Sequence, residues 1–197
     1  MNLPNKLSVI RMILVPVIVL TMIFPYAQFD IVLPVYSVGF VTISLLNIIV
    51  LILFVIASAT DFIDGYIARK YNLITSFGKF IDPIADKMLV NTMFVMFVFQ
   101  GIVPVAAVLI MIWRDTIVDG IRMVSSGKGV VMAAGYLGKI KTVSQMFTII
   151  FVLLNNLPFE LYNLPITDFL LWFSVSVSVL SGFSYFMQSK SVLFESM

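Results

Sequence analysis

Four aspartates occur as two pairs in the stretch DFIDGYIARKYNLITSFGKFIDPIAD. Asp61 and Asp64 are three residues apart, and Asp82 and Asp86 are four apart, so each pair lies on one face of a helix. If a turn near residue 73 joins the two helices into an antiparallel hairpin, Asp61 and Asp86 face each other and Asp64 and Asp82 form a second layer. The spacing therefore predicts four converging carboxylates.

These carboxylates indicate metal chemistry. Four like charges would repel one another and would be costly to remove from water. The chain contains no cysteine and no histidine, so a general base is most readily a carboxylate and a metal must be held mainly by oxygen. Two divalent cations would neutralise the four charges and leave coordination positions for a diphosphate. The alternative is that acids at helix ends only mark the membrane interface, and that the small residues Gly65, Ala68 and Gly78 only pack.

The chain that must position these residues has the composition of a membrane protein. Of its 197 residues, 61% are hydrophobic and 11% are charged, which is too apolar for a soluble domain. We therefore expect an all-α integral membrane fold that forms one domain over residues 1–197. Its six transmembrane helices are expected at about 8–27, 36–68, 79–100, 103–125, 138–158 and 166–188.

The N-terminal segment is expected to form a short interfacial amphipathic helix ahead of the first span. Leu3, Leu7 and Ile10 lie on one helical face, and Lys6 is among their polar neighbours. Such a helix rests on the membrane surface with its apolar face in the lipid.

Lysine and arginine predict the orientation in the membrane. None occurs between Arg11 and Arg69, or from residue 142 to residue 189. Because positive charges accumulate in cytoplasmic loops, both termini and the aspartates are expected on the cytoplasmic side of the cell membrane. No basic patch stands clear of the expected helices, so the sequence gives no support to nucleic-acid binding.

The aspartate stretch resembles the signature of the CDP-alcohol phosphotransferase family, D-x2-D-G-x2-A-R-x8-G-x3-D-x3-D. Eight letters are fixed in that signature, and this chain matches all of them over 26 residues. The matching residues are Asp61, Asp64, Gly65, Ala68, Arg69, Gly78, Asp82 and Asp86. Six spans and the length of the chain are also similar to the family.

The resemblance implies an activity and a division of labour. Members displace CMP from a CDP-linked lipid by attack of an alcohol, and they form homodimers. Asp61, Asp64, Asp82 and Asp86 would hold two Mg²⁺ ions, for which Mn²⁺ can substitute. Asp86 would also take the proton from the attacking hydroxyl, or would only orient that hydroxyl. The residues implied in binding the CDP-lipid are Asn5, Gly65, Ala68, Arg69, Thr75 and Gly78.

Four basic residues predict an anionic acceptor. Arg114 and Arg122 lie in WRDTIVDGIR, and Lys139 and Lys141 lie in GKIKT. So many charges in membrane helices should face the bundle interior, where they would form a pocket for a phosphate. The alternative is internal pairing, for example of Arg122 with Asp119, together with ordinary cytoplasmic lysines.

Three short elements resemble the glycerophosphate-using branch of the family. They are W-R-D, G-K-I-K-T and the N-terminal LPNKLSVIR, which is similar to N-P-N-x-L-(S/T)-x-x-R except for Leu3 at its first position. The resemblance implies transfer of the phosphatidyl group from CDP-diacylglycerol to sn-glycerol 3-phosphate, giving phosphatidylglycerophosphate and CMP.

Two alternatives remain from the sequence. One is the same chemistry with another acceptor, such as inositol phosphate. The other is a cation transporter that uses the aspartates as its ion site. The carboxylates lie near the expected cytoplasmic end and the outer half offers no matching polar path, which favours the enzyme.

Overall fold

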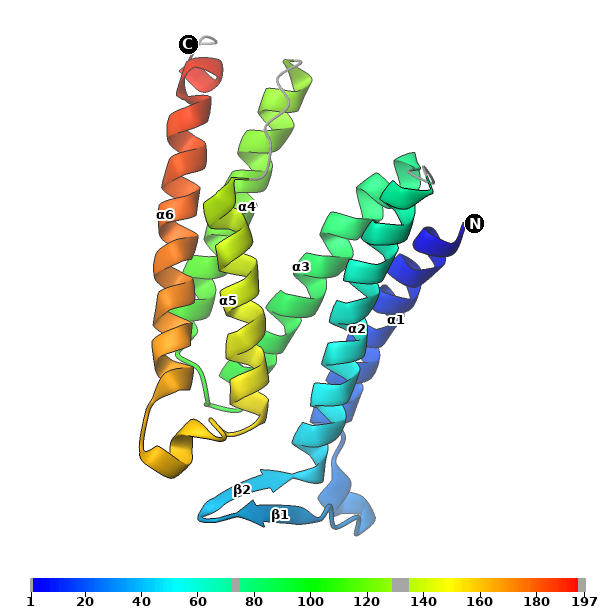
Figure 1. Ribbon diagram of the computed structural model, residues 1–197, viewed down its shortest axis with the longest axis vertical. Coiled ribbons are helices and arrows are strands. Elements are labelled where there is room, and N and C mark those ends of the chain that lie inside the picture. The colour runs from blue at the N-terminus through cyan, green and yellow to red at the C-terminus, as the bar shows by residue number, and fades with distance from the viewer. Residues whose placement is uncertain (1, 72–74, 129–134, 195–197) are drawn as a thin grey trace.

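Helices make up most of the computed structural model, which describes residues 2–71, 75–128 and 135–194 without the side chains of 69, 76, 79 and 191–194. Within these residues the chain forms six α-helices (Figure 1). They are α1 (Leu3–Ile23), α2 (Leu45–Lys70), α3 (Ser76–Phe99), α4 (Val105–Gly127), α5 (Tyr136–Leu153) and α6 (Ile166–Phe194). The shorter elements are η1 (Tyr26–Phe29), η2 (Phe159–Tyr162), β1 (Val35–Val38) and β2 (Val41–Ser44).

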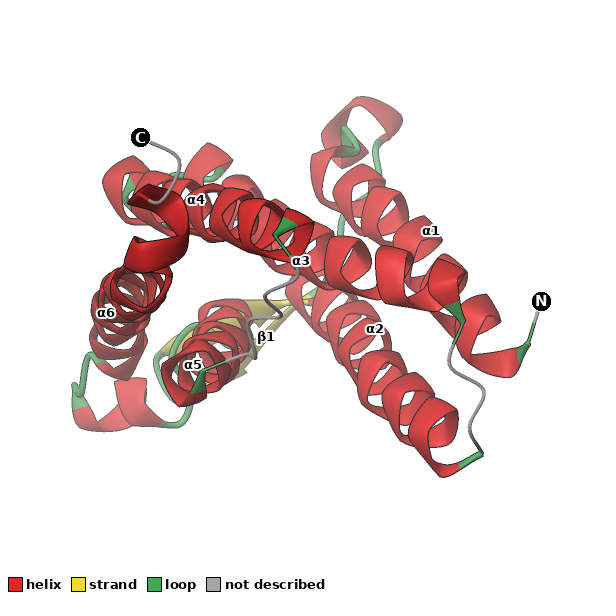
Figure 2. Ribbon diagram, turned by 90° about the horizontal axis from the view of Figure 1, so that it is seen from above, coloured by secondary structure: helices red, strands yellow, loops and turns green. Residues whose placement is uncertain are grey.

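The helices form two groups that meet in the middle of the molecule. Helix α1 packs on α2 and α3, whereas α6 packs on α4 and α5. Figure 2 shows these two groups from above, with α3 running between them. The start of α1 and the end of α6 both lie away from the two strands, which form one end of the molecule (Figure 1). A pocket between the groups is lined by α2 and α3 and, across from them, by α4 and α5.

One apolar core joins the two groups. Phe54 of α2 and Met93 and Phe94 of α3 are buried in it, and the same cluster continues to Met111 of α4 and Ile149 of α5. Helices α3 and α4 follow one another in the chain and belong to different groups, and both contribute side chains to this cluster. This core fixes the distance between the helices that carry the charged residues.

Capping side chains set the start of three helices. The side chain of Asn2 accepts a hydrogen bond from the backbone N–H of Asn5, at 3.3 Å. Ser44 caps α2 in the same way, and Thr75 caps α3 through the backbone N–H of Gly78, at 3.0 Å. Each cap satisfies a donor that the first helical turn would otherwise leave without a partner.

The second membrane helix begins later in the structure than the sequence predicts. We expected it from residue 36, but α2 begins at Leu45 and an antiparallel hairpin precedes it, with Val38 paired to Val41. The hairpin turn contains Gly39 at φ +63°, a conformation that glycine adopts readily and that a helix excludes. The predicted all-α membrane fold is therefore confirmed in its class, with one short two-stranded hairpin added before α2.

The prediction of a separate interfacial helix at the N-terminus is wrong. Residues 3–23 form the single helix α1, which Pro16 does not interrupt. Leu3 and Ile10 are exposed on its outer face, as their spacing predicted, but the opposite face is polar and buried. That polar face packs on α2 and α3, which holds the segment in the bundle instead of on the membrane surface.

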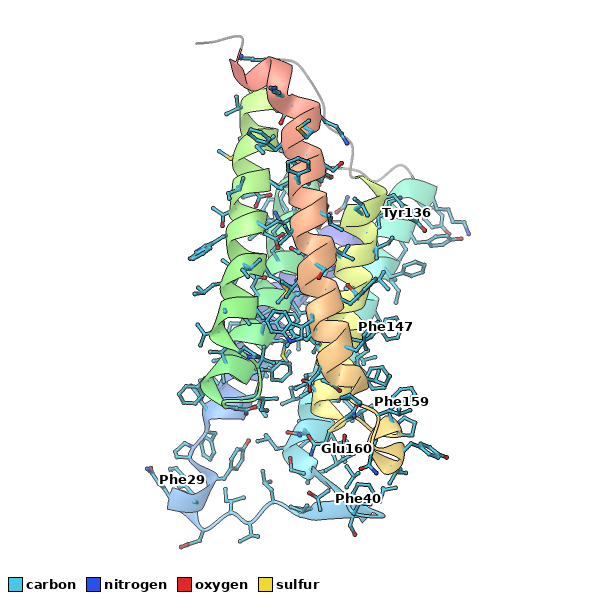
Figure 3. The ribbon with its side chains drawn as sticks, turned by 90° about the vertical axis from the view of Figure 1, so that its left-hand side faces the viewer. Phe29, Phe40, Tyr136, Phe147, Phe159 and Glu160 are labelled. Carbon is cyan, nitrogen blue, oxygen red and sulfur yellow. The ribbon has the colours of Figure 1, made fainter. Side chains whose placement is uncertain are left out.

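The surface of the bundle suits lipid. Large apolar side chains project from it along the length of the helices, including Phe147 of α5 (Figure 3). Four helices of the described chain, α1, α2, α5 and α6, are long and apolar enough to cross a membrane by composition alone. Helices α3 and α4 have 24 and 23 residues, which at 1.5 Å per residue spans about 35 Å, but they carry more charges.

Candidate active site

A buried polar face of α1 contacts both aspartate pairs. Asn5, Ser8 and Arg11 follow one another at intervals of three residues, and all three are buried. The guanidinium of Arg11 donates hydrogen bonds to Asp61 and to Asp64, the latter at 2.6 Å between Nη2 and Oδ2. Helix α1 therefore supplies the cation that lies between the carboxylates of α2.

Ser8 links the two helices of the signature. Its hydroxyl is 2.6 Å from Oδ1 of Asp82 and 3.5 Å from Oδ2 of Asp64. Asp64 and Asp82 thus lie on either side of one hydroxyl, as the expected second layer requires. The expected turn near residue 73 lies outside the described residues.

Three residues expected to bind the CDP-lipid come together at the start of α3. The Thr75 hydroxyl donates to Oδ1 of Asn5, at 3.0 Å, and accepts from the Gly78 N–H. A Cβ atom at Gly78 would lie 3.0 Å from Oδ1 of Asn5, so a side chain there would press on this contact. Gly65 and Ala68 lie on α2 and are partly buried, while the side chain of Arg69 is outside the described part.

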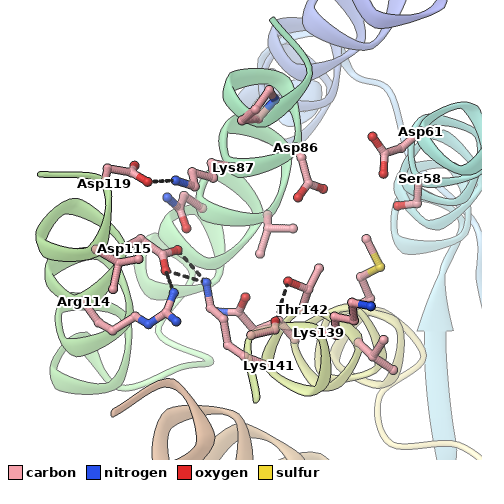
Figure 4. A pocket seen from close by; sticks show the side chains of 18 of the residues that line it. Ser58, Asp61, Asp86, Lys87, Arg114, Asp115, Asp119, Lys139, Lys141 and Thr142 are labelled. Carbon is pink, nitrogen blue, oxygen red and sulfur yellow. Dashed lines mark hydrogen bonds and ion pairs between the residues drawn. The ribbon is translucent and has the colours of Figure 1, made fainter. Parts of the chain in front are cut away.

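A pocket of about 510 Å³ opens between the two helix groups (Figure 4). Asp61 and Asp86 line one side of it, from α2 and α3. The four basic residues predicted to bind an acceptor line the other side. They are Arg114, Arg122, Lys139 and Lys141. The structure therefore brings two of the four predicted carboxylates and all four predicted cations to one chamber, which Asp64 and Asp82 do not line.

Asp115 holds two of the four cations. It accepts a hydrogen bond from Nη1 of Arg114 at 2.8 Å, and bonds from Nζ of Lys141 at 2.7 and 2.6 Å (Figure 4). Asp115 and Lys141 are buried. Because one carboxylate faces two cations, this side of the pocket keeps an excess of positive charge.

The alternative interpretation, in which Arg122 pairs with Asp119, is not what the described side chains show. Nη2 of Arg122 donates to the hydroxyl of Tyr185 at 2.6 Å, and its guanidinium lies 4.9 Å from the centre of that ring. Asp119 instead pairs with Lys87 of α3. Arg122 is therefore held by α6, and the Lys87 pair bridges α3 and α4.

The described acidic side chains do not form a group of three that is already close enough to hold a metal ion. In this structure Arg11 is the partner of Asp61 and Asp64. The donor set nevertheless suits a hard divalent cation, since it consists of oxygen atoms only. One arginine also leaves the four signature carboxylates with a large excess of negative charge. The residues present therefore fit such an ion by their chemistry.

Sequence reasoning missed several residues that form the site. From the sequence, Arg11 was interpreted only as a positive charge for orientation and as part of an N-terminal motif, and Ser8 only as part of that motif. Their three-residue spacing from Asn5 was the signal that could have placed them on one polar face. Tyr185 had no such signal, because it lies in a long apolar helix.

Comparisons with known proteins show which family the sequence matches. The model of the CDP-alcohol phosphatidyltransferase family matches residues 1–180. A protein of Bacillus subtilis (strain 168), named CDP-diacylglycerol--glycerol-3-phosphate 3-phosphatidyltransferase, is 42% identical over 98% of this chain and 97% of its own length. A protein of the same name from Rickettsia bellii (strain RML369-C) is 35% identical over 96% of each chain.

Replacing Asp115 tests whether the basic side of the pocket depends on it. Asp115→Asn should lower the free energy of unfolding by about 3–5 kcal/mol, because Arg114 and the buried Lys141 would lose their shared counter-ion. Asp119→Asn is the matched control, since its more exposed pair with Lys87 should contribute at most about 1 kcal/mol. Thermal unfolding in detergent measures both, and equal losses would contradict the role given to Asp115.

Proposed function

The chain belongs to the CDP-alcohol phosphatidyltransferase family, and from this premise we propose that it makes phosphatidylglycerophosphate. It would transfer the phosphatidyl group of CDP-diacylglycerol to sn-glycerol 3-phosphate and release CMP, as the names of its relatives state for them. One observation carries the choice of acceptor: a single pocket is lined by signature carboxylates on one side and by four cations on the other.

We propose that Asp61, Asp64, Asp82 and Asp86 hold two Mg²⁺ ions, for which Mn²⁺ can substitute. When bound, such ions neutralise the diphosphate and polarise the phosphorus that is attacked. The CDP part would lie beside Asn5, Thr75 and Gly78, where the missing side chain of Gly78 lets a ligand approach the backbone. Gly65, Ala68 and Arg69 would complete that binding surface.

The acceptor would be held by its phosphate. The metal ions on the carboxylate side would neutralise the donor diphosphate. The four cations are therefore available to bind a second phosphate, that of the acceptor. Arg114 and Arg122 are oriented by Asp115 and Tyr185, which fixes where their N–H groups point. Arginine forms paired, charge-assisted hydrogen bonds to phosphate, and Lys139 and Lys141 add two point charges. The hydroxyl of the acceptor is thereby placed toward Asp86.

In the reaction, the acceptor hydroxyl oxygen forms a bond to the phosphorus of the phosphatidyl group. The bond between that phosphorus and the CMP oxygen breaks, and CMP leaves with the electron pair. We propose that the hydroxyl proton passes to the carboxylate of Asp86, which lines the pocket opposite the cations. Holding both substrates in line in one chamber supplies much of the rate enhancement.

Inositol phosphate, the alternative acceptor, also carries a phosphate that the four cations could bind, but the names of the relatives favour glycerol 3-phosphate. Family membership favours the transferase over a cation transporter.

We further propose that the protein is a multi-pass protein of the cell membrane with six spans, and that its termini and pocket face the cytoplasm. A homodimer stays a prediction from the family resemblance.

The acceptor is tested by CMP release from CDP-diacylglycerol with a panel of alcohols. Glycerol 3-phosphate should be the best acceptor, and glycerol should be very poor because it lacks the phosphate. Arg114→Ala or Lys139→Ala should raise the KM for glycerol 3-phosphate by about tenfold or more, since each charged contact to a phosphate contributes about 1.5–3 kcal/mol. The KM for CDP-diacylglycerol should change much less.

Lys6→Ala is the control for these variants, because Lys6 is exposed on α1 and does not line the pocket. The acceptor assignment is wrong if serine or glycerol reacts as well as glycerol 3-phosphate. It is also wrong if the alanine variants weaken only the binding of the CDP-lipid.

The proton acceptor is tested with Asp86→Asn. If Asp86 is the general base, turnover should fall by about 10²–10⁴ while CDP-diacylglycerol still binds. If Asp86 is chiefly a metal ligand, turnover and Mn²⁺ affinity should fall together, as they should for Asp61→Asn. Stopped-flow turnover and binding of a labelled CDP-lipid separate the cases, and a loss below about tenfold would exclude the base role.

The orientation is tested with reporter fusions along the chain. Fusions after residues 30, 102 and 160 should report the outer side, and fusions at 73, 130 and 195 the cytoplasm, as the distribution of lysine and arginine predicts. An outer report at residue 73 would place the aspartates on the wrong side for cytosolic CDP-linked chemistry.

A further inference from the structure

Arg11 is the most deeply buried cation among the described residues, and within them its hydrogen bonds go to signature carboxylates. Its side chain has 0% exposure, while those of Asp61 and Asp64 have 38% and 3%. A buried charge persists only when an opposite charge lies beside it. In this structure Arg11 therefore neutralises part of the negative charge of the signature carboxylates. Asp61 both pairs with Arg11 and lines the pocket.

The contacts of Arg11 are incomplete for a purely structural arginine. Its two terminal nitrogens donate to the carboxylates, but Nε is buried and has no hydrogen-bond partner among the described residues. Buried polar groups in a settled structural network are normally satisfied. Among the described residues, Asp61 and Asp64 are thus the hydrogen-bond partners of the guanidinium, and Nε has none.

We infer that Arg11 is a built-in counter-ion that stabilises the metal-free site and competes with divalent cations for Asp61 and Asp64. This rests on the proposed function, because it takes the signature carboxylates to be the metal ligands. A positive guanidinium beside those ligands repels an incoming cation, and it occupies one oxygen of each carboxylate. Arg11 would be a positioning residue, since it acts on the ligands and not on the substrates.

The competition has a structural route through α1. Ser8 lies one turn before Arg11 on the same buried face and touches Asp82 and Asp64. Asn5, one turn earlier again, contacts Thr75 at the start of α3. A shift of Arg11 away from the carboxylates would therefore also move Ser8 and Asn5, which lie on the same face of α1. Asn5 contacts the expected CDP-lipid surface. Metal binding and the donor surface would be coupled through one helix.

The test measures Mn²⁺ binding to the purified full-length protein in detergent, by the loss of the sharp electron paramagnetic resonance signal of free Mn²⁺. Arg11→Gln should bind Mn²⁺ about tenfold or more tightly than the unaltered protein, because the competing charge is gone. Arg11→Lys keeps the charge and should bind within about threefold of the unaltered protein. Lys6→Gln, which removes an exposed charge from the same helix, should leave the affinity unchanged.

Thermal unfolding supplies a second readout. Without metal, Arg11→Gln should unfold at a lower temperature, and saturating Mn²⁺ should raise its Tm by more than it raises that of the unaltered protein. If Arg11→Gln does not stay folded without metal, it can be purified with Mn²⁺ and the ion removed by graded chelation. Arg11→Lys still tests whether the positive charge at this position lowers Mn²⁺ affinity.

The outcomes separate the inference from the proposed function. Equal or weaker Mn²⁺ binding by Arg11→Gln, in a protein whose unaltered form binds Mn²⁺, overturns the counter-ion role and leaves the transferase standing. Weaker binding by both Arg11 variants would make Arg11 a residue that orients the ligands for the metal. No Mn²⁺ binding by the unaltered protein overturns the metal site itself, whereas the acceptor is judged separately by CMP release.

Discussion

A charged side chain among membrane helices is tolerated only where an opposite charge or a polar partner lies beside it, and this requirement organises the whole site. Arg11 lies against Asp61 and Asp64, Lys87 against Asp119, and Asp115 between Arg114 and Lys141. Each of these pairs except Arg114 with Asp115 joins two different helices. The ion pairs therefore link α1 to α2, α3 to α4 and α4 to α5 around the pocket.

The same requirement divides the chamber by charge. Helices α1 to α3 contribute carboxylates in excess of the one buried arginine, and α4 and α5 contribute cations in excess of Asp115. An anionic donor that arrives with divalent cations suits the first side, and an anionic acceptor suits the second. Two negatively charged substrates that would repel each other in water can thus be held next to one another.

Local spacing made much of this site predictable. Each aspartate pair lies within one helix, so helical periodicity is enough to predict that its two members share a face. The contacts of Arg11 and Arg122 were not predictable in the same way, because their partners lie 50 and 63 residues away. The hairpin before α2 was also missed, since its residues are as apolar as a span and only Gly39 signals a turn.

The central claim is that the acceptor phosphate binds in the same chamber as the metal carboxylates. Phosphorus nuclear magnetic resonance of glycerol 3-phosphate, with the protein loaded with Mn²⁺, tests it directly because a paramagnetic ion broadens only nearby nuclei. The account predicts strong broadening with the unaltered protein and little with an equally loaded Arg114→Ala variant. A sharp phosphorus line with the unaltered protein, at a concentration that supports turnover, or equal broadening in both proteins, would contradict it.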